Sequence, residues 1–186
     1  ASGVLGWSGV AIPEAVGGFD LGYVAMAGLL EEMGEVQFCS PFLGSIAFAA
    51  MAITEGGAPS VRDGFLPGLA DGTVLASLGW RAKGGDPEAM GIRAEAQGNA
   101  YVLNGEAHYV VGGGHAQVLV LLAKTESGHV MAVVGHDEAG VSQRVTPTMD
   151  PTRRRGAIVL NDVAVPLAHV AQLDPRTLAR VFDLCR

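Results

Sequence analysis

The sequence contains little cysteine, little charge and no long apolar run. The two cysteines, Cys39 and Cys185, lie far apart and form no Cys-x-x-Cys pair and no metal-binding spacing with histidine. We therefore expect a reduced, cytoplasmic protein and no disulfide scaffold. Charged residues make up 17% of the 186 and hydrophobic residues 49%, which excludes a disordered chain. The longest apolar run, residues 46–53, is far shorter than the roughly 20 residues of a membrane span.

Basic clusters are also scarce. The net charge of −7 speaks against nucleic-acid binding. The one basic run is residues 153–155, three arginines, for which a solvated turn is a better interpretation than a phosphate clamp.

The neighbouring acids at 31–32 and 137–138 indicate surface positions, so we assign them no acid–base role. Four histidines lack metal-ligand spacing, and we expect no metal site; they are His108, His115, His129 and His136.

The first 72 residues predict helices. Asp20 is placed to cap a helix over residues 21–36, whose apolar positions share one broad face. Residues 42–54 are apolar nearly all round, which predicts a buried helix ended by the glycines that follow. A short helix is expected over residues 59–70. The turn Asp71-Gly72 then marks a change of periodicity.

From residue 73 to residue 173 the apolar pattern has a period of two, which predicts an antiparallel β-domain. Residues 92–97 alternate between apolar and polar side chains. We interpret Asn104-Gly105 as a hairpin turn, because this dipeptide favours the left-handed conformations that such turns require. Further strands are expected over residues 117–124, 129–134 and 157–165. Asp174-Pro175 predicts the start of a further helical element over residues 174–186.

Two glycine-rich segments bear on ligand binding. Residues 112–114 are three glycines between two expected strands, so a turn is favoured over a phosphate-binding loop, which would need a following helix. Residues 84–86 could form an ordinary turn, or a loop that faces the same ligand as residues 105–111. If the chain has a cofactor site, we expect it between these two segments.

The order of short motifs resembles the acyl-CoA dehydrogenase family, flavoproteins that desaturate acyl-CoA thioesters. The similarity extends over nearly the whole chain. The segments that carry it are GWSGVAIPEAVGG at 6–18, LEEMG at 30–34, ASLGWRAKGGD at 76–86, YVLNGEAHYVVGG at 101–113 and GAIVLNDVAVP at 156–166.

This resemblance implies an α+β fold with a helical N-terminal domain, a middle β-barrel and a C-terminal helical bundle. On that basis residues 1–72 are a partial helical domain, residues 73–173 the barrel, and residues 174–186 the first helix of the bundle. The family's catalytic carboxylate lies in the bundle, so no catalytic residue is assigned here. We expect the chain to be a piece of a longer protein.

The resemblance also implies FAD as cofactor and an acyl-CoA as substrate. The cofactor-binding positions that it indicates are Leu78, Gly79, Gly84, Gly85, Tyr109, Val110 and Val111, and the substrate-binding positions are Gly85 and Asp86. Three of the positions carry a hydroxyl in the family and none here: Gly79, Gly85 and Val111. Losing three neutral hydrogen bonds would weaken FAD binding by about 2–4 kcal/mol. Trp80 adds bulk where the family has glutamate.

Two functions follow from the resemblance. One is a FAD-dependent acyl-CoA dehydrogenase acting in fatty-acid or steroid side-chain metabolism. The other is a flavin-poor, non-catalytic subunit of a heteromeric dehydrogenase, an arrangement similar to some enzymes of bacterial steroid side-chain degradation. In either case we expect a homo- or hetero-oligomer, consistent with the high apolar fraction, and an electron-transfer flavoprotein as partner.

Overall fold

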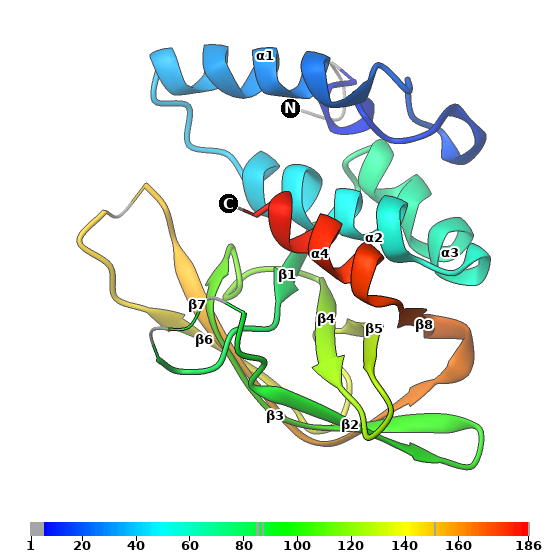
Figure 1. The fold of residues 1–186 in the computed structure, drawn as a ribbon. Coiled ribbons are helices and arrows are strands. Elements are labelled where there is room, and N and C mark those ends of the chain that lie inside the picture. Colours follow the sequence, from blue (N-terminus) through cyan, green and yellow to red (C-terminus); the bar gives the residue numbers. More distant parts are fainter. Residues whose placement is uncertain (1–5, 85, 87, 151, 186) are drawn as a thin grey trace.

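A layer of helices covers one side of a curled β-sheet (Figure 1). The computed structural model describes residues 6–84, 86, 88–150 and 152–185. The helical elements are η1 (Trp7–Gly9), η2 (Glu14–Val16), α1 (Gly22–Glu35), η3 (Leu43–Ala50), α2 (Met51–Gly56), α3 (Pro59–Ala70), η4 (Leu167–His169) and α4 (Pro175–Asp183). The expected helices over 21–36, 42–54 and 59–70 are thus confirmed. No described helix is long and apolar enough to cross a membrane.

The expected cap of the first helix is wrong. Leu21 is the residue that precedes α1, no side chain caps the helix, and Asp20 has a positive φ of 50°. The reason lies in the backbone of the preceding segment. Asp20 N–H donates to the Ile12 carbonyl at 3.0 Å, and Leu21 N–H donates to the Val10 carbonyl at 2.9 Å. Asp20 is therefore held by the lead-in loop and not by the first turn of α1.

The buried helix predicted over residues 42–54 continues from η3, a π-helix, into α2. A π-helix is rare and is often found at functional sites. Ser45 Oγ accepts a hydrogen bond from the Ala76 N–H at 3.0 Å, which fixes η3 to the sheet. A Cβ at Gly44 would lie 2.7 Å from the Val111 carbonyl oxygen, so only glycine allows this close approach. The helix is docked on two strands at once.

In the described part of the chain, eight strands form one mostly antiparallel sheet, which confirms the α+β fold class. They are β1 (Ala76–Gly79), β2 (Ile92–Gln97), β3 (Ala100–Val111), β4 (Val118–Lys124), β5 (His129–Gly135), β6 (Val141–Thr146), β7 (Arg155–Pro166) and β8 (Val170–Leu173). Their order is β6-β7-β3-β2-β4-β5-β8, and β1 pairs with β4 in parallel. β6 and β8 were not predicted, because neither short segment shows a strong apolar alternation.

Strands β4 and β5 separate two apolar cores. Leu119 and Leu121 pack inside the curl of the sheet, whereas Val120 and Leu122 pack against the helices. Both faces of these strands are buried, which explains their nearly continuous apolar sequence. The last helix, α4, is capped as predicted, since the Asp174 carboxylate accepts from the N–H groups of the first turn. It returns to the helical layer beside α2 (Figure 1).

Asn104-Gly105 does not form the predicted hairpin turn. It lies inside the continuous strand β3, where the register against β7 shifts between Leu103 and Gly105. Gly105 has φ +122°, and a Cβ there would lie 2.2 Å from the Gly91 carbonyl oxygen. The left-handed preference of the dipeptide therefore serves a β-bulge instead of a turn. The hairpin between β2 and β3 turns at residues 98–99.

Candidate functional site

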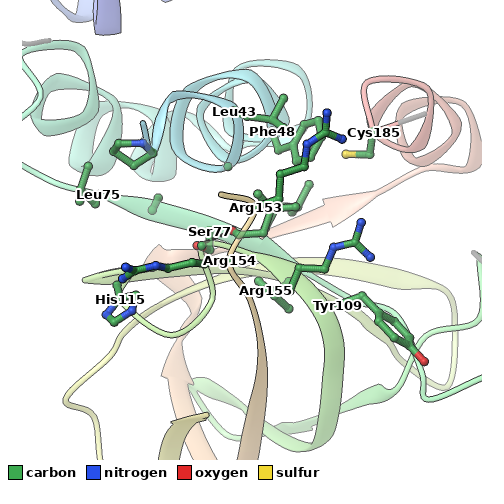
Figure 2. A pocket seen from close by; sticks show the side chains of 18 of the residues that line it. Leu43, Phe48, Leu75, Ser77, Tyr109, His115, Arg153, Arg154, Arg155 and Cys185 are labelled. Atoms are coloured by element: carbon green, nitrogen blue, oxygen red, sulfur yellow. Dashed lines mark hydrogen bonds between the residues drawn. The ribbon is translucent and has the colours of Figure 1, made fainter. Parts of the chain in front are cut away.

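A cavity of about 900 Å³ lies between the helical layer and the sheet. Leu43, Gly44 and Phe48 of η3 form part of one wall. The opposite wall is made by β1 and by the end of β3. The segment 152–155 and Cys185, close to the end of the described chain, complete the rim (Figure 2). Segments that are far apart in the sequence thus border one space.

Of the two segments that we expected to face a common ligand, only residues 105–111 reach this cavity, and there they meet β1. Ser77 of β1 donates its hydroxyl to the Val111 carbonyl at the end of β3 over 3.0 Å. His108 N–H donates to the Arg81 carbonyl at 2.8 Å. The Arg81 guanidinium lies 5.9 Å from the centroid of the Tyr109 ring, within the range of a cation–π contact. These contacts fix the end of β1 against the end of β3.

The structure brings four of the predicted cofactor-binding residues to the cavity: Leu78, Tyr109, Val110 and Val111. Gly84 and Asp86 lie in the connection between β1 and β2, away from the cavity lining. Their roles in binding stay predictions. Gly85, expected to contact both cofactor and substrate, lies outside the described residues.

The interpretation of Gly79 as a lost flavin-facing hydroxyl needs correction. A Cβ at this position would lie 3.2 Å from Ala107 Cβ, 3.2 Å from Val110 Cγ2 and 3.3 Å from Ile158 Cδ1. These atoms belong to the core inside the sheet. A side chain at residue 79 is thus directed into the sheet interior, and Gly79 is not among the residues that line the cavity. The packing of β1 on β3 accounts for this glycine.

Trp80 has a role that the sequence did not indicate. Its ring lies 5.5 Å from that of Phe182 on α4, with 41° between the planes. The bulk that we expected beside the site therefore holds α4 against the sheet. Cys185 lines the same part of the cavity. Burial raises the pKa of its thiol to about 12.

Tyr109 stands out in the cavity wall because its backbone is in the left-handed region, with φ 59°. This conformation is unfavourable for a bulky residue and occurs where β3 shifts register against β7 between Ala107 and Val110. The bulge turns the Tyr109 side chain outward, where it is 42% exposed. Tyr109 also borders a second hollow of about 400 Å³, next to residues 146–150.

The charged side chains around the cavity are all basic. Arg81 and the arginines at 153–155 line it, and the lining residues that the structure describes include no carboxylate. His108 also lines it, with its Nε2 2.9 Å from Oε2 of Glu106. No group of three potential ligands among the described residues could hold a metal ion. The arrangement suits an anionic ligand with a flat or apolar body.

Comparison with known proteins identifies the family of this chain. The acyl-CoA dehydrogenase N-terminal domain matches residues 1–73. Cyclohex-1-ene-1-carbonyl-CoA dehydrogenase of Geobacter metallireducens is 34% identical over 119 residues, or 62% of this chain and 31% of the relative. A structure described as "Tcur3481-Tcur3483 steroid ACAD G363A variant" has a TM-score of 0.85 at 30% identity, covering 98% of this chain and 49% of that one. The chain belongs to the acyl-CoA dehydrogenase family.

This member of the family spans less than half the length of the curated relatives that it matches, 31% of one and 43% of another. Its fold is also that of the ChsE4-ChsE5 complex from Mycobacterium tuberculosis, with a TM-score of 0.87 at 23% identity, covering 98% of this chain and 49% of that one. The described cavity lies within the part that is shared.

Proposed function

We propose that this chain contributes the flavin-facing and thioester-facing walls of a FAD-dependent acyl-CoA dehydrogenase. The observation that carries the proposal is the meeting of β1, the end of β3 and η3 around one cavity. Its volume of about 900 Å³ lies within the range of small-molecule and cofactor sites. The reaction would remove hydrogen from the α and β carbons of an acyl-CoA.

The residues of the cavity fit a flavin. Leu78 is buried and apolar, and Tyr109 offers an aromatic ring at the same cavity. An apolar wall with a few polar groups at its rim is the usual design of a site for a flat heteroaromatic ring. When bound, FAD would supply the hydride acceptor. The part of this chain would be to hold the ring and to exclude water from it.

The acyl group of the thioester would lie against η3. Leu43 and Phe48 present apolar side chains to the cavity from that helix (Figure 2). Because the described lining residues include no carboxylate, this chain offers no obvious base for the α-proton. We infer that the base belongs to a part of the enzyme beyond these residues, and that this chain binds and orients its ligands.

A second function is favoured by one feature of the site, its shortage of hydroxyl groups toward the flavin. Val111 lines the cavity at a position where the family resemblance implies a threonine. The alternative is a flavin-poor subunit that supports a flavin-binding partner within a heteromeric dehydrogenase. The similarity to a protein described as a complex, ChsE4-ChsE5, is consistent with such an arrangement.

The flavin content of the natural full-length protein separates the two functions. We would express it alone and together with a candidate partner subunit, and measure the absorbance at 450 nm per protomer. One FAD per protomer for the protein alone would support the first function and exclude the second. Flavin that appears only in the joint preparation, at one FAD for each pair of subunits, would support the second. A flavin-free protein in both preparations would contradict both.

A further inference from the structure

A histidine–glutamate pair connects the cavity with the outside of the sheet. The His108 side chain lines the cavity and is only 13% exposed, whereas the Glu106 side chain is 50% exposed and is not among the lining residues. The His108 Nε2 lies 2.9 Å from the Glu106 Oε2. The pair therefore joins a nearly buried imidazole at the cavity wall to a carboxylate that is in contact with solvent.

The two side chains meet because they are two residues apart on β3. Successive side chains of a strand point to opposite faces, and Ala107 between them packs in the core inside the sheet. Glu106 and His108 thus share the outer face. Both backbone positions are held, since Glu106 N–H donates to the Gly91 carbonyl at 3.1 Å and His108 N–H donates to the Arg81 carbonyl at 2.8 Å. The contact between the two side chains therefore starts from a fixed backbone.

An imidazole ring can accept a proton at one nitrogen and release one from the other. The Glu106 carboxylate accepts the hydrogen bond from Nε2, which leaves Nδ1 as the nitrogen that exchanges protons with the cavity. In the described part of the chain His108 has no other side-chain hydrogen-bond partner. The ring is thus bonded on the solvent side and open on the other.

The other polar groups at the cavity do not provide such a connection. Arg81 and the arginines at 153–155 line it, and a guanidinium group does not accept a proton. His115, Tyr109 and Cys185 also line it, but within the described residues none of them is paired with a carboxylate. Among these lining groups, His108 alone is linked to a carboxylate that reaches solvent.

We propose that His108 and Glu106 form a proton relay between the cavity and solvent. This inference rests on the proposed function, in which the α-hydrogen of the acyl-CoA leaves as a proton and the β-hydrogen as a hydride. The proton taken up by the base has to leave the enclosed site. In the relay a proton binds Nδ1, the Nε2 proton passes to Glu106, and Glu106 releases it to water. Only N–H and O–H bonds form and break, and no electrons are transferred.

The test follows one turnover of the natural full-length protein loaded with FAD, together with its partner subunit if flavin binding requires one. The substrate is the acyl-CoA that reduces the flavin fastest in a series of straight-chain and steroid side-chain thioesters. Flavin reduction is read at 450 nm, and proton release from a soluble pH indicator at a separate wavelength. In Glu106→Gln and His108→Gln proton release should be at least about tenfold slower than in the parent, with FAD content and flavin reduction unchanged.

Matched variants separate a relay from a structural role. Glu95→Gln removes an exposed carboxylate of β2 and should release protons as fast as the parent. Imidazole in the buffer should restore fast release to His108→Ala, because the cavity of about 900 Å³ can admit it. A role limited to holding β3 in place would not respond to imidazole.

Nuclear magnetic resonance of the flavin-free protein tests the pair without any turnover. The ring-nitrogen signals of His108 should show a proton on Nε2 in the parent and in Glu95→Gln, and a mixture of both tautomers in Glu106→Gln. A proton on Nδ1 alone in the parent would overturn the relay, because Nε2 would then have no proton to give to Glu106.

Failure of the relay and failure of the proposed function give different results. Parent-like proton release in both glutamine variants, with normal flavin reduction, would refute the relay and leave the proposed function intact. A slower release that is matched by an equal loss of FAD or of flavin reduction would also refute the relay, since the pair would then only support the site. A parent whose flavin is reduced by no acyl-CoA would refute the proposed function, and the relay with it.

Discussion

Asn104 and Asp162 exchange two hydrogen bonds across the bulge between β3 and β7. The Asn104 amide donates to the Asp162 carboxylate at 2.9 Å, and its oxygen accepts from the Asp162 N–H at 2.9 Å. Asp162 itself has a positive φ of 51°. The pair satisfies backbone and side-chain groups where the ladder is interrupted. It sets the register of the long strand whose far end reaches the cavity.

Replacing Asn104 with alanine should remove both bonds. We expect the free energy of unfolding to fall by about 1–2 kcal/mol, since each bond is worth about 0.5–1.5 kcal/mol. Urea denaturation measures the change. Asn161→Ala, at the exposed neighbour of Asp162, is the control and should stay within about 0.5 kcal/mol of the parent. Equal stability of the two variants would show that the Asn104–Asp162 pair does not hold the bulge.

Threonine at residue 79 should destabilise the protein without improving flavin binding. Its side chain would press against Ala107, Val110 and Ile158, which already lie 3.2–3.3 Å from a Cβ at that position. Overpacking of this kind typically lowers stability by about 1–3 kcal/mol. The measurements are the melting temperature and the FAD dissociation constant of Gly79→Thr.

The matched variant is Val111→Thr, which has nearly the same shape and lies in the cavity wall. It restores a hydroxyl where the flavin is proposed to bind. We expect FAD affinity to rise by about fivefold to tenfold, the value of one neutral hydrogen bond. If Gly79→Thr binds FAD more tightly than the parent and Val111→Thr binds it with unchanged affinity, the orientation of β1 described above is wrong.

Tyr23, Glu55 and Arg180 tie three helices together and predict a pH dependence. Tyr23 Oη donates to Glu55 Oε1 at 2.6 Å, and Arg180 lies 2.7 Å from Glu55 Oε2. Burial, and then the hydrogen bond to the Glu55 carboxylate, raise the pKa of Tyr23. A raised pKa means that folding favours the protonated phenol. The contribution to stability is therefore complete below the unfolded value of about 10 and is lost as the pH rises above it.

Urea denaturation between pH 8 and pH 11 tests this link. The parent should lose stability above about pH 10 more steeply than Tyr23→Phe, whose phenol cannot ionise. Tyr101→Phe is the control, because the Tyr101 hydroxyl accepts from Gln172 and not from a carboxylate. Equal slopes for the parent and Tyr23→Phe would show that Tyr23 titrates as in the unfolded chain.

The elements with a strong local signal were predictable from the sequence. The amphipathic and buried helices, the cap at Asp174 and the doubly buried strand β4 all follow from periodicity and from capping chemistry. The resemblance to acyl-CoA dehydrogenases located Leu78 and residues 109–111 at the cavity. The helices, the cap and the strand depend on neighbours within one turn or one strand, and a single sequence contains that information.

The features that were wrong or missed depend on contacts between distant segments. Whether Asn104-Gly105 becomes a turn or a bulge is decided by β7 and by Gly91, both remote in the sequence. The tight space at Gly79 is made by Ala107 and Val110 of β3 and by Ile158 of β7, all distant in the sequence. The arginines at 153–155 are exposed, as predicted, but the tight packing of β7 on the glycine turn places them at the cavity rim. No local pattern contains that information.

The strained backbone of Tyr109 predicts a conflict between stability and ligand binding. A left-handed conformation costs about 1–2 kcal/mol for most residues and less for asparagine, whose side chain tolerates it. Tyr109→Asn should therefore raise the free energy of unfolding by about 1 kcal/mol, because the Tyr109 ring is 42% exposed and contributes little packing. The same change removes the aromatic wall and the cation–π contact with Arg81, so FAD should bind about tenfold more weakly. Tyr109→Ala should weaken FAD equally without the gain in stability, and a loss of stability in Tyr109→Asn would show that the ring holds the bulge in place.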